Sequence, residues 1–327
     1  MRAVVIPEFG GPEVLKVREM PAPQPAAGQV TIRVAYAGVN YAETMERRGG
    51  HNAGDLPIIP GLEVSGHIAA LGEGVQELRV GQPVAALTYI GGYAEIALAQ
   101  AALTFPLDGY GIDLAVAAGF PTIVPTAYDL LVRVARLQAG ETVLVHAAAG
   151  GVGSIVGQIA RHLGAGQVIG TVSAPNKAEY ARSFGYDHTF LYDEFLQSVR
   201  EVTNGRGVDI VLEALGEPIR SQSLSLLAPF GRLVIFGSAG GHFDNPMALP
   251  EQASNVVNKA IMGYSIGALA RSAPQLITQT AREALPLIAN GHVRIDITDI
   301  LPLEQAGEAH RHLESRATTG KLLLRVQ

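Results

Sequence analysis

The chain has 327 residues, 48% of them hydrophobic and 17% charged, and its formal net charge is −6 at pH 7. These values are typical of a soluble globular protein with room for two domains, and they exclude a disordered or fibrous chain. Lys and Arg are scattered, so we expect no nucleic-acid partner. The absence of cysteine excludes disulfides, thiolate metal sites and a cysteine nucleophile. No signal peptide is recognisable at the start, and the long uncharged run at 142–160 contains four glycines, so we expect a cytoplasmic protein without a membrane partner.

The first part of the chain, about 110 residues long, is predicted to be β-rich because apolar and polar residues alternate between turn-forming residues. The clearest alternation lies at 30–36, which predicts a strand with one buried face. The predicted elements are strands at 2–6, 14–17, 30–36 and 92–98, a short helix within 38–49, and a turn followed by a strand at 61–72.

The middle of the chain alternates strands with helical segments. After Gly111 the pattern becomes helical, and four apolar runs then read as strands. This alternation predicts an α/β fold with a doubly wound parallel sheet. The helices are expected at 115–118, 126–135 and 274–289, and the strands at 142–146, 167–172, 208–212 and 232–236. The apolar tail at 320–326 is expected to return to the first sheet, which gives a substrate domain of residues 1–120 with 265–327 and a nucleotide-binding domain of residues 121–264.

A glycine-rich turn follows the strand at 142–146 and leads into a helix that extends to Leu163. Glycines at such a turn let the backbone approach a pyrophosphate, which the helix N-terminus then binds. The residues expected to do this are Ala149, Gly150, Gly151, Val152 and Gly153. Ala148 replaces the first glycine of the usual fingerprint, so a plain packing turn is the alternative.

The end of the next strand predicts which cofactor is bound. An NAD-selective fold places Asp or Glu about 20 residues beyond the glycine turn. This chain instead has Ser173 and Lys177 in that region. A hydroxyl and an ammonium suit a 2′-phosphate, so NADPH is the expected cofactor. The alternative for Lys177 is a solvated position at a helix start.

Several motifs occur in a characteristic order, namely Gly38-Val-Asn40, Gly61-x-Glu63-x-x-Gly66, Gly81-x-x-Val84, His146-x-x-x-Gly-Gly-Val-Gly153 and Glu314-Ser-Arg316-Ala-Thr-x-Gly-Lys321. With them the chain resembles the medium-chain dehydrogenase/reductase superfamily, and more narrowly the zinc-independent quinone oxidoreductases. The resemblance implies a Rossmann domain beside a β-rich GroES-like domain, a small hydrophobic acceptor such as a quinone or enone, and a homodimer.

The residues argue against a zinc site. Leu62 stands where zinc-dependent relatives have histidine, and there is no cysteine. The closest pair of histidines, His310 and His312, is two residues apart, so the two side chains would not share a helix face. We expect both to be surface residues and no metal to be bound.

The resemblance also nominates catalytic residues. It places Asn40 beside the nicotinamide ribose and the substrate, although Asn40 could equally cap the helix that follows. Many relatives have tyrosine at the position of Met45, and methionine cannot donate a proton. Tyr41 or solvent is therefore expected to supply the proton. The expected substrate contacts are Met45, Tyr89 and Phe243, which would form an apolar, aromatic site.

Further cofactor contacts follow from the same resemblance, at Thr126, Tyr128, Tyr192, Phe236, Gly237, Ser238 and Arg316. Tyr192 would meet the 2′-phosphate together with Lys177, with plain packing as its alternative. Arg316 would reach back toward the cofactor, with a surface ion pair as its alternative.

The predicted function is an NADPH-dependent quinone oxidoreductase that transfers hydride from the nicotinamide C4 without a metal. Three alternatives stay open. One is an enoyl-thioester reductase, for which the pair Arg47 and Arg48 is a weak candidate basic patch, although two solvated arginines are the simpler expectation. The second is a reductase of simple enones or aldehydes. The third is an NADPH-binding protein with little turnover and a structural or interaction role.

Overall fold

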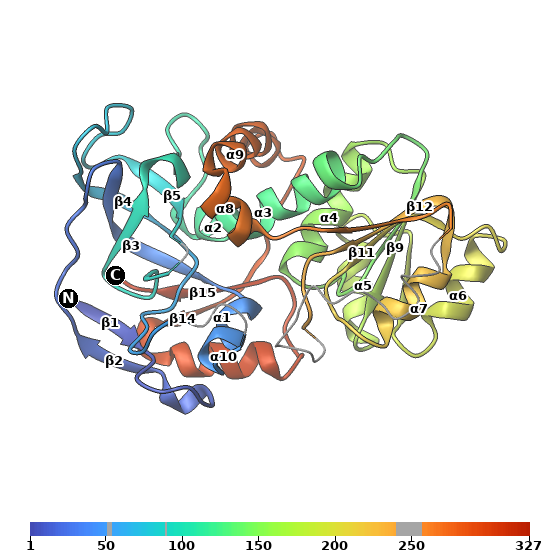
Figure 1. Cartoon of the computed structure of the whole chain (residues 1–327), viewed down its shortest axis with the longest axis horizontal. Coiled ribbons are helices and arrows are strands. Elements are labelled where there is room, and N and C mark those ends of the chain that lie inside the picture. The colour runs from blue at the N-terminus through green and yellow to red at the C-terminus, as the bar shows by residue number, and fades with distance from the viewer. Residues whose placement is uncertain (51–53, 89, 240–256) are drawn as a thin grey trace. The chain divides into compact units, whose positions relative to one another are not determined.

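The computed structural model describes residues 1–50, 54–88, 90–239 and 257–327. The chain forms two compact units (Figure 1). Unit 1 consists of Met1–Pro125 and Ile266–Gln327, and unit 2 consists of Thr126–Ser265. Two of the expected substrate contacts, Tyr89 and Phe243, lie outside the described residues.

Unit 1 is built on strands from both ends of the chain. Its main strands are β3 (Gln29–Val39), β4 (Glu63–Leu71), β5 (Pro83–Leu87), β6 (Ile96–Gln100), β7 (Thr104–Pro106), β14 (Ile297–Pro302) and β15 (Lys321–Arg325), and β1 (Arg2–Val5) pairs with β2 (Lys16–Glu19). In the described part of the chain the main sheet has the order β14-β15-β3-β4-β5-β7, and β6 pairs with the first half of β3. Val30, Ile32 and Val34 of β3 are completely buried in the core of this unit. The strand predicted at 30–36 from the alternation is therefore confirmed.

The tail of the chain completes the sheet of unit 1, which confirms the prediction for 320–326. β15 pairs antiparallel with β3, where Leu322 lies opposite Val39, and parallel with β14. Figure 1 shows the red β15 beside the blue β3. Leu322, Leu323 and Leu324 are at most 2% exposed. Consecutive apolar residues are needed here because both faces of this strand are covered.

The helices of unit 1 are α1 (Tyr41–Arg47), α2 (Leu114–Ala118), α8 (Ile266–Ser272), α9 (Pro274–Ala289) and α10 (Ala306–Glu314), and α3 (Phe120–Asp129) carries the chain into unit 2. α9 has the predicted bounds. The helix predicted at 126–135 begins too late, because α3 begins at Phe120; it continues into a π-helical turn at Leu130–Val134, which ends one residue before the predicted end. Pro121 is tolerated as the second residue, where a backbone N–H has no partner within the helix.

Unit 2 contains strands β8 (Thr142–Val145), β9 (Gln167–Val172), β10 (His188–Leu191), β11 (Val208–Glu213), β12 (Leu227–Ile235) and β13 (Ala260–Gly263), and helices α4 (Gly151–His162), α5 (Asn176–Arg182), α6 (Phe195–Val202) and α7 (Ile219–Ser225). In the described residues the strands are all parallel, in the order β10-β9-β8-β11-β12-β13. This is the doubly wound Rossmann order, so the predicted fold class is confirmed. The strand order reverses between β8 and β11, and ligands of such sheets bind outside the carboxyl ends of the strands at this point.

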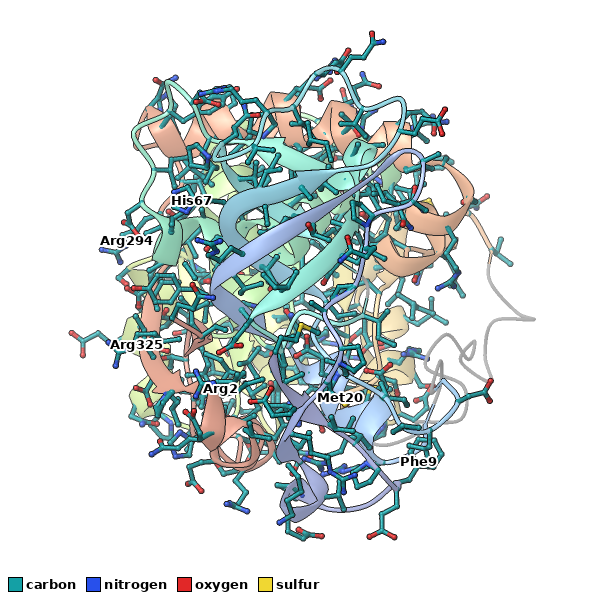
Figure 2. The ribbon with its side chains drawn as sticks, turned by 90° about the vertical axis from the view of Figure 1, so that its left-hand side faces the viewer. Arg2, Phe9, Met20, His67, Arg294 and Arg325 are labelled. Atoms are coloured by element: carbon teal, nitrogen blue, oxygen red, sulfur yellow. The ribbon has the colours of Figure 1, made fainter. Side chains whose placement is uncertain are left out.

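The surface of unit 1 carries charged side chains that are in part tied to each other. Arg2 donates hydrogen bonds to Glu95 at 2.8 Å and to Glu304 at 2.6 Å. Figure 2 shows Arg294 and Arg325 pointing outward, and both are exposed.

Across the described residues, no helix combines the length and the apolar character that a membrane crossing requires.

Candidate functional site

The glycine turn of unit 2 is closely packed where the helix begins. α4 starts directly after Gly150, and a Cβ added at Gly153 would lie 2.8 Å from the Cα of Ala148. Position 153 therefore has no room for a side chain. The first N–H groups of α4 have no partner within the helix, and the helix dipole makes this end favourable for an anion. The local geometry fits a pyrophosphate.

Ala148 occupies the place of the missing first glycine without disturbing the turn. It is completely buried, and its N–H donates to the carbonyl of Thr171 at 2.9 Å. Its methyl group faces Gly170 of β9, where an added Cβ would lie only 2.6 Å from the Ala148 Cβ. The usual fingerprint has a glycine at the position of Ala148. Here the missing side chain of Gly170, on the neighbouring strand, leaves the space that the Ala148 methyl group needs.

The parallel sheet brings most of the predicted cofactor residues of unit 2 to one edge. They follow the carboxyl ends of β8, β9, β10 and β12, and the first three of these are neighbouring strands. The residues are Gly150 to Gly153 after β8, Ser173 and Lys177 after β9, Tyr192 after β10, and Phe236, Gly237 and Ser238 after β12. Segments far apart in sequence therefore share the edge at which such folds bind nucleotides.

Lys177 is only 8% exposed, so the alternative of a solvated lysine is wrong. Burial lowers the pKa of the Lys177 ammonium because it removes hydration. A phosphate dianion would compensate for that loss. Ser173, by contrast, is exposed, and Tyr192 is half-buried.

The loop after β12 contains an unsatisfied polar atom. Ser238 is 2% exposed, and its hydroxyl has no hydrogen-bond partner among the described residues. Buried polar groups normally have a partner from the protein, water or a ligand. Together with the open N-terminus of α4, this orphaned hydroxyl fits a polar ligand at the carboxyl edge of the sheet.

A buried ion pair that the sequence analysis missed supports this loop. Arg220 donates to Glu213 at 2.6 Å and to the carbonyl of Gly237 at 2.8 Å. Glu213 also accepts from the N–H of Gly216 at 2.7 Å, and burial raises the pKa of its carboxyl. No motif in the sequence predicted this ion pair. Glu213 is the last residue of β11 and Arg220 lies in α7, so the two side chains meet only when the strand and the helix have formed.

Thr126 and Tyr128, at the start of unit 2, are placed differently. Thr126 is 6% exposed and lies near Tyr264, whose hydroxyl donates to Asp129 at 2.9 Å. Burial raises the pKa of Tyr264. Tyr128 is half-buried. Thr126 is therefore buried beside a structural hydrogen bond of unit 2.

In unit 1, Asn40 lies between the end of β3 and the first residue of α1. It is the N-cap of α1, and its backbone N–H donates to Glu43 at 2.7 Å, as in a capping box. Asn40 thus occupies the expected N-cap position, but its side chain makes no capping hydrogen bond. Tyr41, the first helical residue, is half-buried, and Met45, one turn later, is 9% exposed.

The side chain of Asn40 is held by a buried ion pair. Its Oδ1 accepts from the Nζ of Lys321 at 2.5 Å, and its Nδ2 donates to Glu63 at 3.0 Å. Lys321 and Glu63 also pair directly at 2.5 Å, and they are 3% and 0% exposed. Both residues occur in motifs quoted above, but their contact with Asn40 could not be inferred from the motifs.

Glu43 is fully buried and accepts several hydrogen bonds. The N–H of Leu62 donates to it at 2.8 Å and the hydroxyl of Tyr93 at 2.7 Å. Burial raises the pKa of the Glu43 carboxyl, and burial together with the Glu43 charge raises the pKa of Tyr93. The Asn40 to Glu43 spacing of a capping box was the one signal in the sequence that could have revealed Glu43.

The expectations for His310 and Arg47 are wrong, because both side chains are completely buried. The Nδ1 of His310 lies 3.2 Å from Arg47, and its Nε2 lies 3.3 Å from the hydroxyl of Tyr93. Arg47 also pairs with Glu314. The cause is that α10 packs against α1, which covers the face of α10 that contains His310, while the side chain of His312 is 41% exposed.

The charge state of His310 follows from its partners. Arginine only donates, so Nδ1 accepts and the ring proton is on Nε2. Burial, together with the nearby arginines, lowers the pKa of His310 to about 3.

Arg316, the predicted cofactor contact near the end of the chain, is exposed. It follows the end of α10 and has a left-handed backbone (φ 56°).

Within the described residues there is no cluster of three or more histidine and carboxylate side chains that could hold a metal ion. At the position where zinc-dependent relatives have a histidine, the side chain is that of Leu62.

Comparison with known proteins gives matches over nearly the whole chain. Residues 26–109 match the family described as alcohol dehydrogenase GroES-like domain, and residues 151–290 match the family described as zinc-binding dehydrogenase. The chain is 36% identical to a quinone oxidoreductase of Pseudomonas aeruginosa, with 97% of each chain covered. It is 33% identical to a 2-haloacrylate reductase of a Burkholderia species, with 99% of each chain covered.

Solved structures agree with these matches. The quinone oxidoreductase of Escherichia coli, complexed with NADPH, superimposes with a TM-score of 0.92 at 30% identity, and all of both chains is covered. A mycobacterial protein complexed with NADPH gives the same TM-score at 34% identity, again with full coverage.

Proposed function

Because the chain belongs to the medium-chain dehydrogenase/reductase superfamily, in its quinone oxidoreductase branch, we propose that it reduces a quinone or a similar conjugated carbonyl acceptor with NADPH. The observation that carries this proposal is the shared edge of the sheet in unit 2. Four loops contribute residues there, and the glycine turn, the buried Lys177 and the unsatisfied Ser238 hydroxyl all suit a phosphorylated dinucleotide.

When bound, NADPH supplies a hydride from its nicotinamide C4. The residues of unit 2 bind and orient it. The N-terminus of α4 would hold the pyrophosphate, and Lys177, with Ser173 and Tyr192, would hold the 2′-phosphate. Phe236 to Ser238, Thr126 and Tyr128 of unit 2 are proposed as further cofactor contacts, and so is Arg316 of unit 1.

The residues of unit 1 would orient the acceptor. Asn40 is proposed to contact both reactants, and Met45, Tyr89 and Phe243 to form the apolar part of the acceptor site. The proton for the reduced acceptor would come from the hydroxyl of Tyr41 or from water, because Met45 has no proton to donate. Leu62 at the zinc-ligand position and the absence of cysteine favour activation of the acceptor without zinc.

Reduction of a carbon–carbon double bond is the second candidate. It is favoured by the similarity to a 2-haloacrylate reductase. For an enoyl thioester, the candidate basic patch predicted from the sequence is the pair Arg47 and Arg48. Only Arg48 is exposed, because Arg47 is buried. Simple enones are therefore better candidates than thioesters for this activity.

The test is to follow the oxidation of NADPH and, separately, of NADH by the purified protein, with a panel of quinones, enones and enoyl thioesters. We expect quinone-dependent oxidation of NADPH, a much slower reaction with NADH, and no loss of activity after treatment with EDTA. Selective reduction of enones would favour the second candidate. Tight NADPH binding without turnover of any acceptor would instead indicate a binding protein.

Lys177→Met tests the basis of the cofactor preference. Loss of a charge-assisted hydrogen bond to the 2′-phosphate should raise the Kd for NADPH roughly ten- to hundredfold. The Kd for NADH should stay nearly the same, because NADH lacks this phosphate. Titrations monitored by nicotinamide fluorescence give both constants, and an equal weakening for the two cofactors would contradict the assignment.

We also propose a homodimer, as in the family that the sequence resembles. Light scattering on the purified protein measures the mass that tests it.

A further inference from the structure

The side-chain amide of Asn40 has only one favourable orientation. An ammonium group only donates hydrogen bonds and an ionised carboxylate only accepts them. Lys321 faces Oδ1 at 2.5 Å, and Glu63 faces Nδ2 at 3.0 Å. Rotation of the amide by half a turn would place its NH₂ group against the ammonium and its oxygen against the carboxylate. Both new contacts would be repulsive.

Lys321 and Glu63 are themselves firmly held. The Lys321 ammonium donates to Asn40, to Glu63 and to the carbonyl of Val39 at 3.1 Å, so its three donors are all used. The other oxygen of Glu63 accepts from the N–H of Thr122 at 2.8 Å. Lys321 and Glu63 are the first residues of β15 and β4, so each side chain starts from a rigid strand.

The sequence also leaves room for this arrangement. A side chain at Gly38, two residues before Asn40, would collide with the carboxylate of Glu63. Gly38 is therefore the residue that lets Glu63 reach the amide. The hydrogen-bonding capacity that the amide keeps for a ligand is one lone pair of Oδ1, because Nδ2 faces the carboxylates of Glu63 and Glu43.

We propose that Lys321 and Glu63 are positioning residues that hold the amide of Asn40 in the orientation in which it acts on the reactants. This inference rests on the proposed function, since Asn40 is proposed to orient NADPH and the acceptor. A buried charge pair costs desolvation and is often no more stabilising than an apolar pair. Its orienting effect on Asn40 gives a reason for its presence beside a candidate catalytic residue.

A double-mutant cycle tests the proposal. The pair variant Glu63→Gln/Lys321→Met removes both charges and therefore leaves no unpaired charge in the interior. It is made in the wild-type background and in the Asn40→Ala background. In the first, kcat should fall about tenfold, with little change in the acceptor KM, because hydride transfer depends on correct positioning. In the second, the same pair should change kcat by less than about twofold, because the group it positions is gone.

The control is the pair Glu141→Gln/Arg232→Met in unit 2. This ion pair makes two hydrogen bonds, of 2.8 and 2.7 Å, and is partly buried. We expect it to leave kcat unchanged in both backgrounds. Equal effects of Glu63→Gln/Lys321→Met with and without Asn40 would show a purely structural role and overturn the inference.

The Kd for NADPH is measured for the same variants by nicotinamide fluorescence. This measurement separates the positioning role from the proposed function. A wild-type protein that binds NADPH but reduces no acceptor would contradict the proposed function. Coupling between Asn40 and the pair in the Kd values would then support the positioning role, and its absence would overturn it. A wild-type protein that binds no NADPH would overturn both.

Discussion

At the scale of single residues, buried charge is concentrated around the start of α1. Glu43 and Glu63 are completely buried, and Lys321 directly compensates Glu63. Glu46, one turn beyond Glu43, is half-buried. Burial, and then the charge of Glu43, raise the pKa of Glu46 to about 7. Each uncompensated carboxylate at this site therefore costs stability when it ionises.

The variant Glu46→Gln should reveal this cost. The folded state holds the Glu46 proton up to about pH 7, whereas the unfolded state releases it near pH 4.5. The folded state thus binds more protons in this window, and the contribution of Glu46 to the free energy of unfolding falls as the pH rises through it. Compared with wild type, Glu46→Gln should be more stable by about 1–2 kcal/mol at pH 8 and equally stable at pH 4.

Urea unfolding at the two pH values measures the difference. The matched control is Glu179→Gln, at an exposed position of the helix α5, which should change neither value. A Glu46→Gln protein with the same stability as wild type at pH 8 would contradict the raised pKa of Glu46.

At the scale of elements, the glycine turn and β9 depend on each other. The methyl group of Ala148 fills the space in front of Gly170, and the ring of Tyr186 also packs there, 2.8 Å from where a Cβ would be. The hydroxyl of Tyr186 donates to the carbonyl of Gly153 at 2.6 Å. The shape of the nucleotide loop is therefore set partly by the strand that follows α4.

Exchange of the two small residues tests this dependence. Gly170→Ala should overpack the interface, lower the free energy of unfolding by about 1–3 kcal/mol and weaken NADPH binding. Ala148→Gly/Gly170→Ala, which moves the methyl group from one side of the contact to the other, should recover part of both losses. Urea unfolding and nicotinamide fluorescence provide the measurements. A double variant no better than Gly170→Ala alone would argue against the contact.

At the scale of the whole molecule, each unit contains a buried neutral histidine. In unit 2, His146 lies 2.8 Å from Thr171 and 2.7 Å from Ser223, and in unit 1, His310 lies between Arg47 and Tyr93. Burial lowers the pKa of both histidines to about 3. Between pH 6.5 and this value the unfolded chain binds protons that the folded chain does not, so both units lose stability as the pH falls.

Acid should therefore destabilise the protein through both units. From pH 7 to pH 5, each of the two histidines should lower the free energy of unfolding by up to about 2 kcal/mol. His146→Asn and His310→Asn should each start from a lower stability at pH 7 and show a smaller loss on acidification. Urea unfolding between pH 7 and pH 5 tests this, and His67→Asn, at an exposed position of β4, should keep the wild-type slope.

Much of the fold was predictable because its signals are local. The apolar periodicity predicted β9 and α9 with their observed bounds, and the alternation of strands and helices predicted the parallel sheet. The residue types of the glycine turn and of Lys177 indicated a phosphorylated dinucleotide in the same way. The start of α3 was missed, and its first turn contains Pro121, which is tolerated there because the first N–H groups of a helix have no partner within it.

The sequence by itself determined the order of the elements, the class of the fold and the chemistry expected at the glycine turn, because these depend on residues close together in the chain. Only the tertiary structure decided which polar side chains are buried together. Lys321 contacts Asn40 across 281 residues, and His310 contacts Arg47 across 263. The physical reason is that a lysine or histidine carries the same local signal on a surface as in the interior, and its partner is chosen by the packing of distant strands and helices.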